Sequence, residues 1–364
     1  MRSTDQPADC ALPYALQARV EIPDPKSCLR HLCNHMREHG VDVQEDDGVF
    51  TVILPNVAGS LRQDGRHVAV DAAAADLDAL YFVKMWLQAE ISELMSNPAP
   101  PIEWNEGSRN LCLPPSFRTL AVVAVGDVTP RMRRITFRGN GIEHFDTLSA
   151  LHLQILVNLG DIVAQERRHG VAAARVPEIS QVIPVWRRYT VRSVDRARGT
   201  IDVDFFLHGS RGPGTSWARK ARPGDMAGAA GPSGGGIAKA SWYLLAGDET
   251  ALPAISRILE CLPATARGTV AIEVDSDIER QELDCPSGMA VEWIYRKTGA
   301  TASRRTLLDA VEGADVPPRG DSRFAWVGCE AGMAKKIRSH LHGERALTKS
   351  ERLVVAFWHG DGDI

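Results

Sequence analysis

Residues 186–192, WRRYTVR, combine cationic side chains with an aromatic ring and a hydroxyl group. Arg187 and Tyr189 are two positions apart, so on a β-strand they lie on the same face. There the guanidinium would neutralise a phosphate while the phenol ring lies flat against a planar cofactor. Thr190 points the opposite way, and its hydroxyl and backbone would reach a ring nitrogen at the edge of that cofactor. The alternative is an exposed cationic strand with a packed tyrosine.

A glycine-rich segment, HGSRGPGTSWA at residues 208–218, follows a predicted strand and leads into a short helical turn. Its glycines allow backbone N–H groups to converge on an anion at the start of that turn, and a diphosphate would fit there. The alternative is an ordinary long hairpin loop. The candidate binding residues are His208, Gly209, Gly212, Gly214, Thr215, Ser216 and Trp217.

Two later segments run from an apolar strand through a tight turn into a helix: LLAGDETALPA at residues 244–254 and WVGCEAGM at residues 326–333. Such a turn places a helix N-terminus at the carboxyl end of a parallel strand, where open α/β sheets bind nucleotides. The first segment lacks GxGxxG, so the Rossmann fingerprint is absent, and a purely structural turn is the alternative. Two such turns at one sheet edge would form a cleft. Its candidate residues are Asp248, Thr250, Ala251, Leu252, Gly328, Glu330 and Ala331.

The hydrophobic patterns around these motifs predict a multidomain protein. Residues 16–105 combine alternating and helical patterns and predict a small α+β domain. Residues 116–236 contain short strands separated by Gly, Asn, Asp and Pro turns, which predicts an antiparallel β-barrel. Residues 240–364 alternate strands with helices, which predicts a parallel sheet covered on both faces. The Pro-rich, polar stretch at residues 96–115 is interpreted as a linker.

The composition excludes several classes of protein. With 44% apolar and 24% charged residues among 364, the chain has the composition of a globular protein. Its 42 basic and 46 acidic residues give a net charge of −4, which provides no global field for nucleic acid or an anionic membrane. No apolar run reaches the roughly 20 residues of a membrane span, and residues 1–8 lack the apolar region of a secretory signal. The seven cysteines are widely spread and never form CxxC, which predicts reduced thiols and a cytoplasmic protein.

In their order along the chain, these motifs resemble the siderophore-interacting protein family, flavin-dependent ferric-siderophore reductases of the ferredoxin-reductase-like superfamily. The resemblance covers residues 118–363 and implies FAD in the barrel and NADPH or NADH in the α/β domain. By this resemblance Arg187, Tyr189 and Thr190, followed by Val191 and Arg192, belong to the flavin-binding strand, and residues 212–218 to the pyrophosphate loop. Residues 248–253 match the start of the nicotinamide-nucleotide domain. Phe357, Trp358 and Gly360 resemble its C-terminal aromatic segment, which makes Trp358 a cofactor-binding candidate.

The resemblance implies hydride transfer from the nicotinamide to flavin N5, followed by single-electron transfer to ferric iron. Tyr189 would stack on the isoalloxazine and Thr190 would hydrogen-bond near N5, which makes these two the catalytic candidates. Siderophores built from hard oxygen donors hold ferrous iron weakly, so reduction would release the metal. Two alternatives stay open: a general flavin or quinone-type oxidoreductase on the same scaffold, and a non-catalytic protein that binds ferric siderophores.

Several residues bear on specificity. Gln154 stands where the family commonly has Lys, so a basic site for an anionic siderophore would lack one cation. Gly214 replaces the usual Ala, which should not weaken a phosphate site made by the backbone. Residues 273–275, EVD, favour a free ribose hydroxyl, whereas nearby cations would meet a 2′-phosphate. The choice between NADPH and NADH therefore stays open. These cations are Arg280, Arg296 and Lys297, with Arg167, Arg168, His169 and Arg175 interpreted as solvated charges of a long loop.

Residues 16–105 resemble a small domain family of unknown function that also occurs fused to siderophore-interacting proteins. Residues 59–70 are predicted as one strand and residues 72–95 as an amphipathic helix. On the preceding predicted helix, Cys28 and His31 are expected on one face while Cys33 and His35 turn away from it. The prediction is therefore structural thiols and no metal site.

Overall fold

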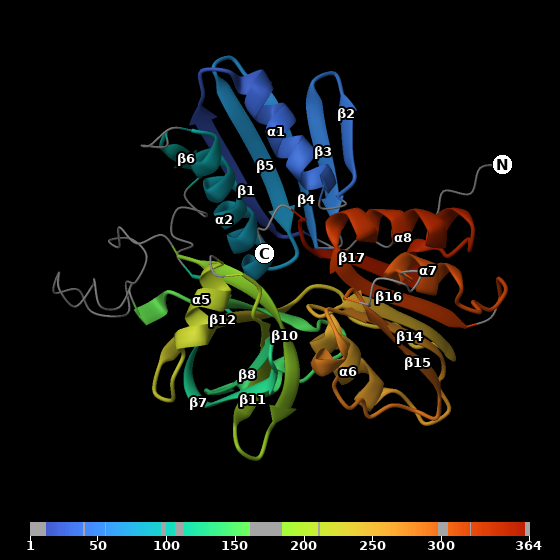
Figure 1. Ribbon diagram of the computed structural model, residues 1–364. Coiled ribbons are helices and arrows are strands. Elements are labelled where there is room, and N and C mark those ends of the chain that lie inside the picture. Colours follow the sequence, from blue (N-terminus) through green and yellow to red (C-terminus); the bar gives the residue numbers. More distant parts are fainter. Residues whose placement is uncertain are drawn as a thin grey trace. The chain divides into compact units, whose positions relative to one another are not determined.

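The computed structural model describes residues 12–38, 41–54, 56–95, 100–105, 113–160, 184–209, 212–297, 305–320 and 322–360. They belong to two compact units, one up to Ser116 and one from Phe117 onward (Figure 1). Within the described ranges, no helix combines the length and the apolar character that crossing a membrane requires.

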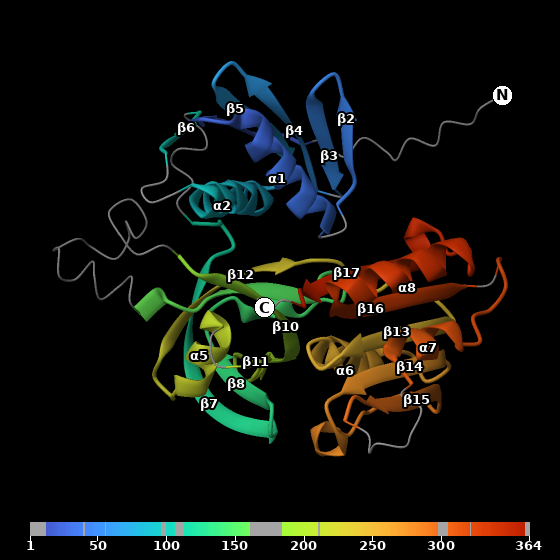
Figure 2. The ribbon, with the colours of Figure 1, turned by 45° about the horizontal axis from the view of Figure 1, so that its top comes forward.

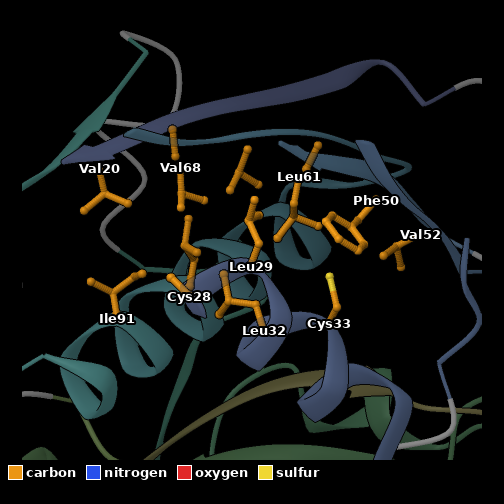
Figure 3. Close-up of a cluster of buried hydrophobic side chains, with 14 of the residues drawn as sticks. Val20, Cys28, Leu29, Leu32, Cys33, Phe50, Val52, Leu61, Val68 and Ile91 are labelled. Atoms are coloured by element: carbon orange, nitrogen blue, oxygen red, sulfur yellow. The ribbon is translucent and has the colours of Figure 1, made fainter. Parts of the chain in front are cut away.

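The first unit is a six-stranded antiparallel sheet with two helices, α1 (Pro25–Glu38) and α2 (Leu77–Leu94), on one face. Figure 3 shows side chains of both helices, such as Leu32 and Ile91, packed against sheet residues such as Leu61. In sheet order the strands are β2 (Val43–Asp46), β3 (Val49–Leu54), β4 (Val57–Asp64), β5 (His67–Ala74), β1 (Tyr14–Glu21) and β6 (Ile102–Trp104).

Three boundaries in this unit differ from the sequence prediction. Residues 59–70 are not one strand, because the chain reverses at Gly65, where φ is +61°, and divides into β4 and β5. The second helix begins at Leu77, where Asp76 accepts a hydrogen bond of 2.7 Å from the Ala79 N–H, so residues 72–74 still belong to β5. The predicted linker contains β6, which pairs with β1 at the sheet edge.

The second unit begins with the predicted antiparallel barrel, which is closed by six strands (Figure 2). Around the barrel they are β10 (Trp186–Asp195), β11 (Thr200–Phe206), β8 (Met132–Arg138), β7 (Arg118–Thr129), β12 (Met226–Ser233) and β9 (His152–Leu156). Helix α5 (Pro213–Lys220) follows β11 and packs Ala218 into the barrel core, which contains Phe137, Phe205 and Val191. The prediction of a β-barrel domain is confirmed.

The second unit ends with the predicted parallel sheet. Its order is β15 (Gly288–Tyr295), β14 (Arg267–Val274), β13 (Trp242–Asp248), β16 (Arg323–Glu330) and β17 (Arg352–Trp358). Helix α6 (Leu252–Cys261) covers one face, and α7 (Leu307–Glu312) and α8 (Ala331–Gly343) cover the other. From β13 the chain adds β14 and then β15 toward one edge of the sheet, and it then returns to place β16 on the other side of β13. The sheet therefore has a topological switch point between β13 and β16, where such sheets bind ligands.

The barrel and the parallel sheet meet at helix α6. Arg257, only 5% exposed, donates hydrogen bonds of 2.9 Å to the carbonyl oxygens of Val191 and Phe145 in the barrel domain. Beside it, Nη1 of Arg192 on β10 lies 2.9 Å from Oε2 of Glu260 on α6. Buried hydrogen bonds of this kind are costly to break, so they fix the orientation of β10 relative to the parallel sheet.

Candidate functional site

Arg187, Tyr189 and Gly214 are brought together by strand β10 and helix α5. The Tyr189 ring lies against the barrel core, with its centroid 4.1 Å from that of Phe205. Its hydroxyl occupies the space that a Cβ atom on Gly214 would need, and Cγ of Arg187 is 3.6 Å from the same position. The absence of a side chain at Gly214 thus lets the phenol and the base of the Arg187 side chain reach the start of α5.

Burial raises the pKa of the Tyr189 phenol, and the nearby Arg187 guanidinium opposes that shift. The hydroxyl therefore stays protonated at neutral pH. A neutral phenol can both donate and accept a hydrogen bond beside the helix.

Helix α5 offers backbone N–H groups at the same place. The helix begins after Gly212, with Pro213 in its first turn, and the first hydrogen bond runs from Ser216 N to Gly212 O at 2.8 Å. The N–H groups of Gly214 and Thr215 belong to the first turn, where a helix provides no internal acceptor and carries a partial positive charge. Beside Arg187, this helix start can hold an anion such as a diphosphate.

The side chains of Thr215 and Trp217 support the barrel. The Thr215 hydroxyl, in a residue 2% exposed, donates a 3.4 Å hydrogen bond to the carbonyl of Phe206. The Trp217 indole stacks on Phe137 with 6.0 Å between ring centroids and 6° between planes. These two side chains anchor α5 to the barrel. The backbone N–H groups of its first turn are therefore left to contact an anion. Ser210 and Arg211 lie outside the described residues.

His208 and Gly209 form the approach to α5. The His208 ring stacks on Phe206 with 6.3 Å between centroids, and the Gly209 carbonyl accepts a hydrogen bond of 3.4 Å from Arg219. Burial lowers the pKa of His208, and the nearby cations Arg131 and Arg219 lower it further. The imidazole is therefore neutral at pH 7.

Thr190 faces a buried histidine. The Thr190 hydroxyl lies 3.2 Å from Nδ1 of His152 on β9, and the two residues are directly opposite in the β9–β10 register. Burial, together with Arg188 and Arg257, lowers the pKa of His152 to about 3. The imidazole is neutral, and its tautomer decides which of the two groups donates. His152 is not among the site residues that the sequence predicts, although its position opposite Thr190 follows once the strand register is known.

Two predicted cofactor residues of β10 lie elsewhere. The Val191 side chain is fully buried in the barrel core, and Arg192 is bound to Glu260 at the junction with α6. The alternation of side chains along a strand explains why Val191 is buried. Val191 lies on the same face of β10 as Arg187 and Tyr189, two positions beyond Tyr189.

The switch point between β13 and β16 is lined by glycines. A Cβ atom on Gly247 would overlap Ala251 and the Gly328 carbonyl, and one on Gly328 would lie 3.0 Å from the Phe357 ring. Close approach of the two strand ends therefore depends on both glycines. Ala251 and Leu252 are buried at the start of α6, so their side chains pack in the core.

Asp248 and Glu330 organise the turns that follow these strands. Asp248 Oδ1 accepts a hydrogen bond of 2.9 Å from Thr250 N, and Oδ2 accepts one of 2.8 Å from Trp358 Nε1. Burial raises the pKa of Asp248, while the bonds from Thr250 and Trp358 oppose the shift. Glu330 caps α8, which begins at Ala331, by accepting a 2.8 Å hydrogen bond from Met333 N. Both carboxylates thus hold backbone in place.

The cations beyond β14 and β15 are matched by carboxylates. Arg296 is ion-paired with Glu249 and lies 3.3 Å from Glu273, and Lys297 lies 2.7 Å from Asp275. The Lys297 ammonium lowers the pKa of Asp275, which is therefore ionised at neutral pH. Arg280 lies over the Trp293 ring at 5.6 Å. A 2′-phosphate would meet negative as well as positive charge here.

One aromatic residue links the two halves of the site. The Phe357 ring, near the end of β17, covers Gly328 at the switch point. Its centroid is 5.3 Å from that of His152, edge to face, and His152 in turn contacts Thr190. The strand that carries Arg187 and Tyr189 is thus connected to the switch point of the parallel sheet through two rings.

Three family models match the chain. They are the Siderophore-interacting FAD-binding domain over residues 121–236, the Siderophore-interacting protein family over residues 240–361, and an uncharacterized family conserved in bacteria, DUF2218, over residues 17–105. The first two together span the second compact unit, and the third lies within the first.

Individual relatives agree with these matches. The chain is 30% identical over 249 residues to the ferric vibriobactin reductase ViuB of Vibrio cholerae, an alignment that covers 66% of this chain and 89% of that protein. The siderophore-interacting protein SipS from Aeromonas hydrophila superposes with a TM-score of 0.56 at 30% identity, over 68% of this chain and 93% of that one. A siderophore utilization protein from T. fusca gives 0.55 at 34% identity, over 67% and 93%. With its FAD-binding barrel, its parallel sheet and these relatives, the chain belongs to the siderophore-interacting protein family.

Proposed function

We propose that the protein is a reductase that uses FAD and NADPH or NADH to reduce the ferric iron of a siderophore complex. The observation that carries this proposal is the cradle formed by Arg187, Tyr189 and the start of α5 at Gly214. It combines a cation, an aromatic ring and a helix N-terminus, which are the groups that a dinucleotide with a flat ring system requires.

The residues of the cradle fit FAD on their own chemistry. Arg187 and the first-turn N–H groups of Gly214 and Thr215 would neutralise the diphosphate. Tyr189 would offer its neutral ring as a stacking surface. Thr190, whose hydroxyl is 3.2 Å from His152, would contribute a hydrogen bond at the ring edge. The chemistry that bound FAD supplies is the conversion of a hydride donor into a source of single electrons.

The nicotinamide nucleotide would bind at the switch point of the parallel sheet. Gly247 and Gly328 allow the two strand ends to lie close together there, and Asp248 and Trp358 hold the turn in position. Phe357, which contacts His152, would shield the space between the two cofactors from water. Exclusion of water protects a hydride from side reactions.

An anionic ferric siderophore would meet a cation on the barrel surface near Thr190. Arg188 is exposed and lies directly opposite Gln154 in the β9–β10 register. Side chains of directly opposed residues are close neighbours, so Arg188 would supply positive charge where Gln154 does not. Since siderophore oxygen donors hold ferrous iron weakly, reduction would release the metal. The names of ViuB and SipS support this choice of substrate class.

A reducing compartment suits the thiols of the chain. Cys28, Cys33, Cys261, Cys285 and Cys329 are free in the part of the chain that the structure describes. Free buried thiols are typical of cytoplasmic proteins, so we propose that the reaction takes place in the cytoplasm.

The visible absorption spectrum of the purified protein tests this function. Under anaerobic conditions, a yellow protein should bleach on addition of NADPH or NADH. It should then regain its oxidised spectrum when a ferric siderophore is added, while a ferrous chelator takes up the released iron. Comparing the two nucleotides at equal concentration ranks them.

Other results of this experiment would contradict the proposal. A colourless protein that does not take up FAD would indicate a non-catalytic siderophore-binding protein. Bleaching followed by reoxidation with quinones but not with ferric complexes would indicate a quinone-type oxidoreductase on the same scaffold.

A further inference from the structure

Three side chains with metal-binding groups converge in the first compact unit. His31 and His35 lie on α1, and Glu90 lies on α2. Nδ1 of His35 is 3.1 Å from Oε2 of Glu90, and Nε2 of His31 is 3.6 Å from the same oxygen. One ligand atom from each residue falls within 4.8 Å of the other two.

The sequence expectation that His35 turns away from His31 is wrong. Residues four apart on an α-helix are neighbours on one face, so both imidazoles point toward α2. Cys33 instead enters the hydrophobic core together with Cys28 (Figure 3). Burial raises the pKa of each thiol to about 11, so both stay protonated and serve as packing groups. The metal-binding candidates are thus the two histidines with a glutamate from another helix.

The buried carboxylate is the central group of this cluster. The Glu90 side chain is only 6% exposed, whereas those of His31 and His35 are 43% and 31% exposed. A buried carboxylate oxygen is a strong ligand for a cation because little water competes for it. The partly exposed imidazoles leave a cation a route from solvent to this oxygen.

We propose that His31, His35 and Glu90 bind a divalent first-row transition metal ion. Two ligands about 2.1 Å from a tetrahedral ion are about 3.4 Å apart. The two separations from the Glu90 oxygen, 3.1 Å to His35 and 3.6 Å to His31, lie close to this value. All three ligand atoms fall within 4.8 Å of one another, so small side-chain rotations would bring them around one ion. Two imidazoles and one carboxylate form a donor set that binds Zn²⁺ or Fe²⁺ and leaves positions for water. Mg²⁺ and Ca²⁺ prefer oxygen ligands throughout and do not suit it.

The competing interpretation is a pair of ordinary His–Glu contacts that hold α1 and α2 together without an ion. The two interpretations differ in stoichiometry, because metal binding takes up one ion per chain and the contacts alone take up none.

Metal titration of the full chain distinguishes them. The protein is first treated with a chelator and then titrated at neutral pH with ZnCl₂, with FeSO₄ under anaerobic conditions, or with MgCl₂, and bound metal is measured by elemental analysis. The variants are H31Q, H35Q and E90Q. H67Q, which removes a histidine from β5 of the same unit, is the matched control.

The wild type and H67Q should each bind one equivalent of Zn²⁺ or Fe²⁺, and MgCl₂ should not compete. Each of the three site variants should lose affinity by at least about 100-fold, because even a residue that only supports a ligand costs 10–100-fold. Zn²⁺ should also raise the unfolding temperature of the wild type and leave those of the site variants unchanged.

Absence of a bound equivalent in the wild type, or equal affinity in H31Q, H35Q and H67Q, would overturn the proposal. If E90Q fails to fold, the two histidine variants still decide, because their side chains are partly exposed and their unfolding temperatures without metal serve as the check. Visible bands of bound Co²⁺ give a second readout of the ligand set. The test uses neither FAD nor reductase activity, so its outcome is independent of the proposed function.

Discussion

The indole Nε1 of Trp358 donates a hydrogen bond of 2.8 Å to Oδ2 of Asp248. Asp248 ends β13 and Trp358 ends β17, and β16 lies between these two strands in the sheet. The bond therefore spans the switch point and ties the turn after β13 to the end of β17. Because Asp248 is 4% exposed, few other donors can replace the indole.

Substituting Trp358→Phe keeps an aromatic ring and removes this donor. The buried carboxylate then lacks a hydrogen bond, which costs about 1–3 kcal/mol. We expect a lower unfolding temperature and a higher KM for the nicotinamide nucleotide, with FAD content unchanged. Differential scanning fluorimetry and steady-state kinetics measure both effects. An unaltered KM would mean that the turn keeps its shape without Trp358.

Substituting Gly214→Ala places a methyl group where the Tyr189 hydroxyl lies. Overpacking of this kind costs about 1–3 kcal/mol. FAD affinity should therefore fall by roughly ten-fold. This loss is expected even though alanine stabilises a helix more than glycine does. The double variant Gly214→Ala with Tyr189→Phe removes the overlapping hydroxyl and should recover most of the affinity. Fluorescence titration with FAD compares the two. Equal affinities in both variants would contradict the steric explanation.

The pKa of His152, lowered to about 3, predicts an acid sensitivity with a definite sign. Above pH 6.5 the imidazole is neutral in both the folded and the unfolded chain. As the pH falls below 6.5 only the unfolded chain gains this proton, so stability is lost by up to about 1.4 kcal/mol per pH unit down to about pH 3.

Replacing His152 by Gln keeps a hydrogen-bonding group for Thr190 and removes the titration. Unfolding temperatures between pH 7.5 and 5 should therefore fall more steeply in the wild type than in His152→Gln. Parallel curves would show that the buried imidazole does not govern acid sensitivity in this range.

Asp275 is ionised beside Lys297 and would repel a 2′-phosphate. Substituting Asp275→Asn should raise kcat/KM for NADPH relative to NADH by about fivefold, which corresponds to ~1 kcal/mol of charge interaction. Asp195→Asn, which removes a carboxylate from the barrel hairpin, is the control. An unchanged ratio would mean that the ribose does not approach β14.

Arg188 is expected to attract anionic ferric siderophores. Substituting Arg188→Gln should raise KM for an anionic complex about two- to fivefold, because an exposed charge contributes up to about 1 kcal/mol. The effect should shrink in high salt and be absent with a neutral complex. Arg138→Gln, another exposed arginine on the barrel, is the control. Equal effects on anionic and neutral complexes would rule out an electrostatic role.

The α+β domain, the β-barrel and the parallel sheet were each predicted from hydrophobic patterns within short segments of sequence. The structure confirms all three. Short strands between turns in residues 116–236 predicted the barrel, and strands alternating with helices in residues 240–364 predicted the parallel sheet. Apolar alternation cannot show where a chain reverses within a polar turn, so the Gly65 turn between β4 and β5 was missed. The start of α2 depends on the Asp76 cap, which hydrophobic spacing does not register.

The contacts missed by sequence analysis join residues that are distant in the chain. His152 meets Thr190 only because β9 and β10 pair in one register, and Glu90 meets His35 only because α1 and α2 pack on the same sheet face. Arg192, predicted as a cofactor-binding residue of the flavin-binding strand, is instead bound to Glu260 of the parallel-sheet domain. Composition and spacing carry no information about such partners.

The order of the strands also sets an order of synthesis. All six barrel strands, with Arg187, Tyr189 and Gly214, leave the ribosome before β13 does. Because domains generally fold as units during translation, the dinucleotide cradle is able to form early. The switch-point edge must wait for β17, which is the last of the described strands to be made and brings Phe357 and Trp358 together. A nascent chain would thus complete the residues of the barrel cradle before those of the switch point.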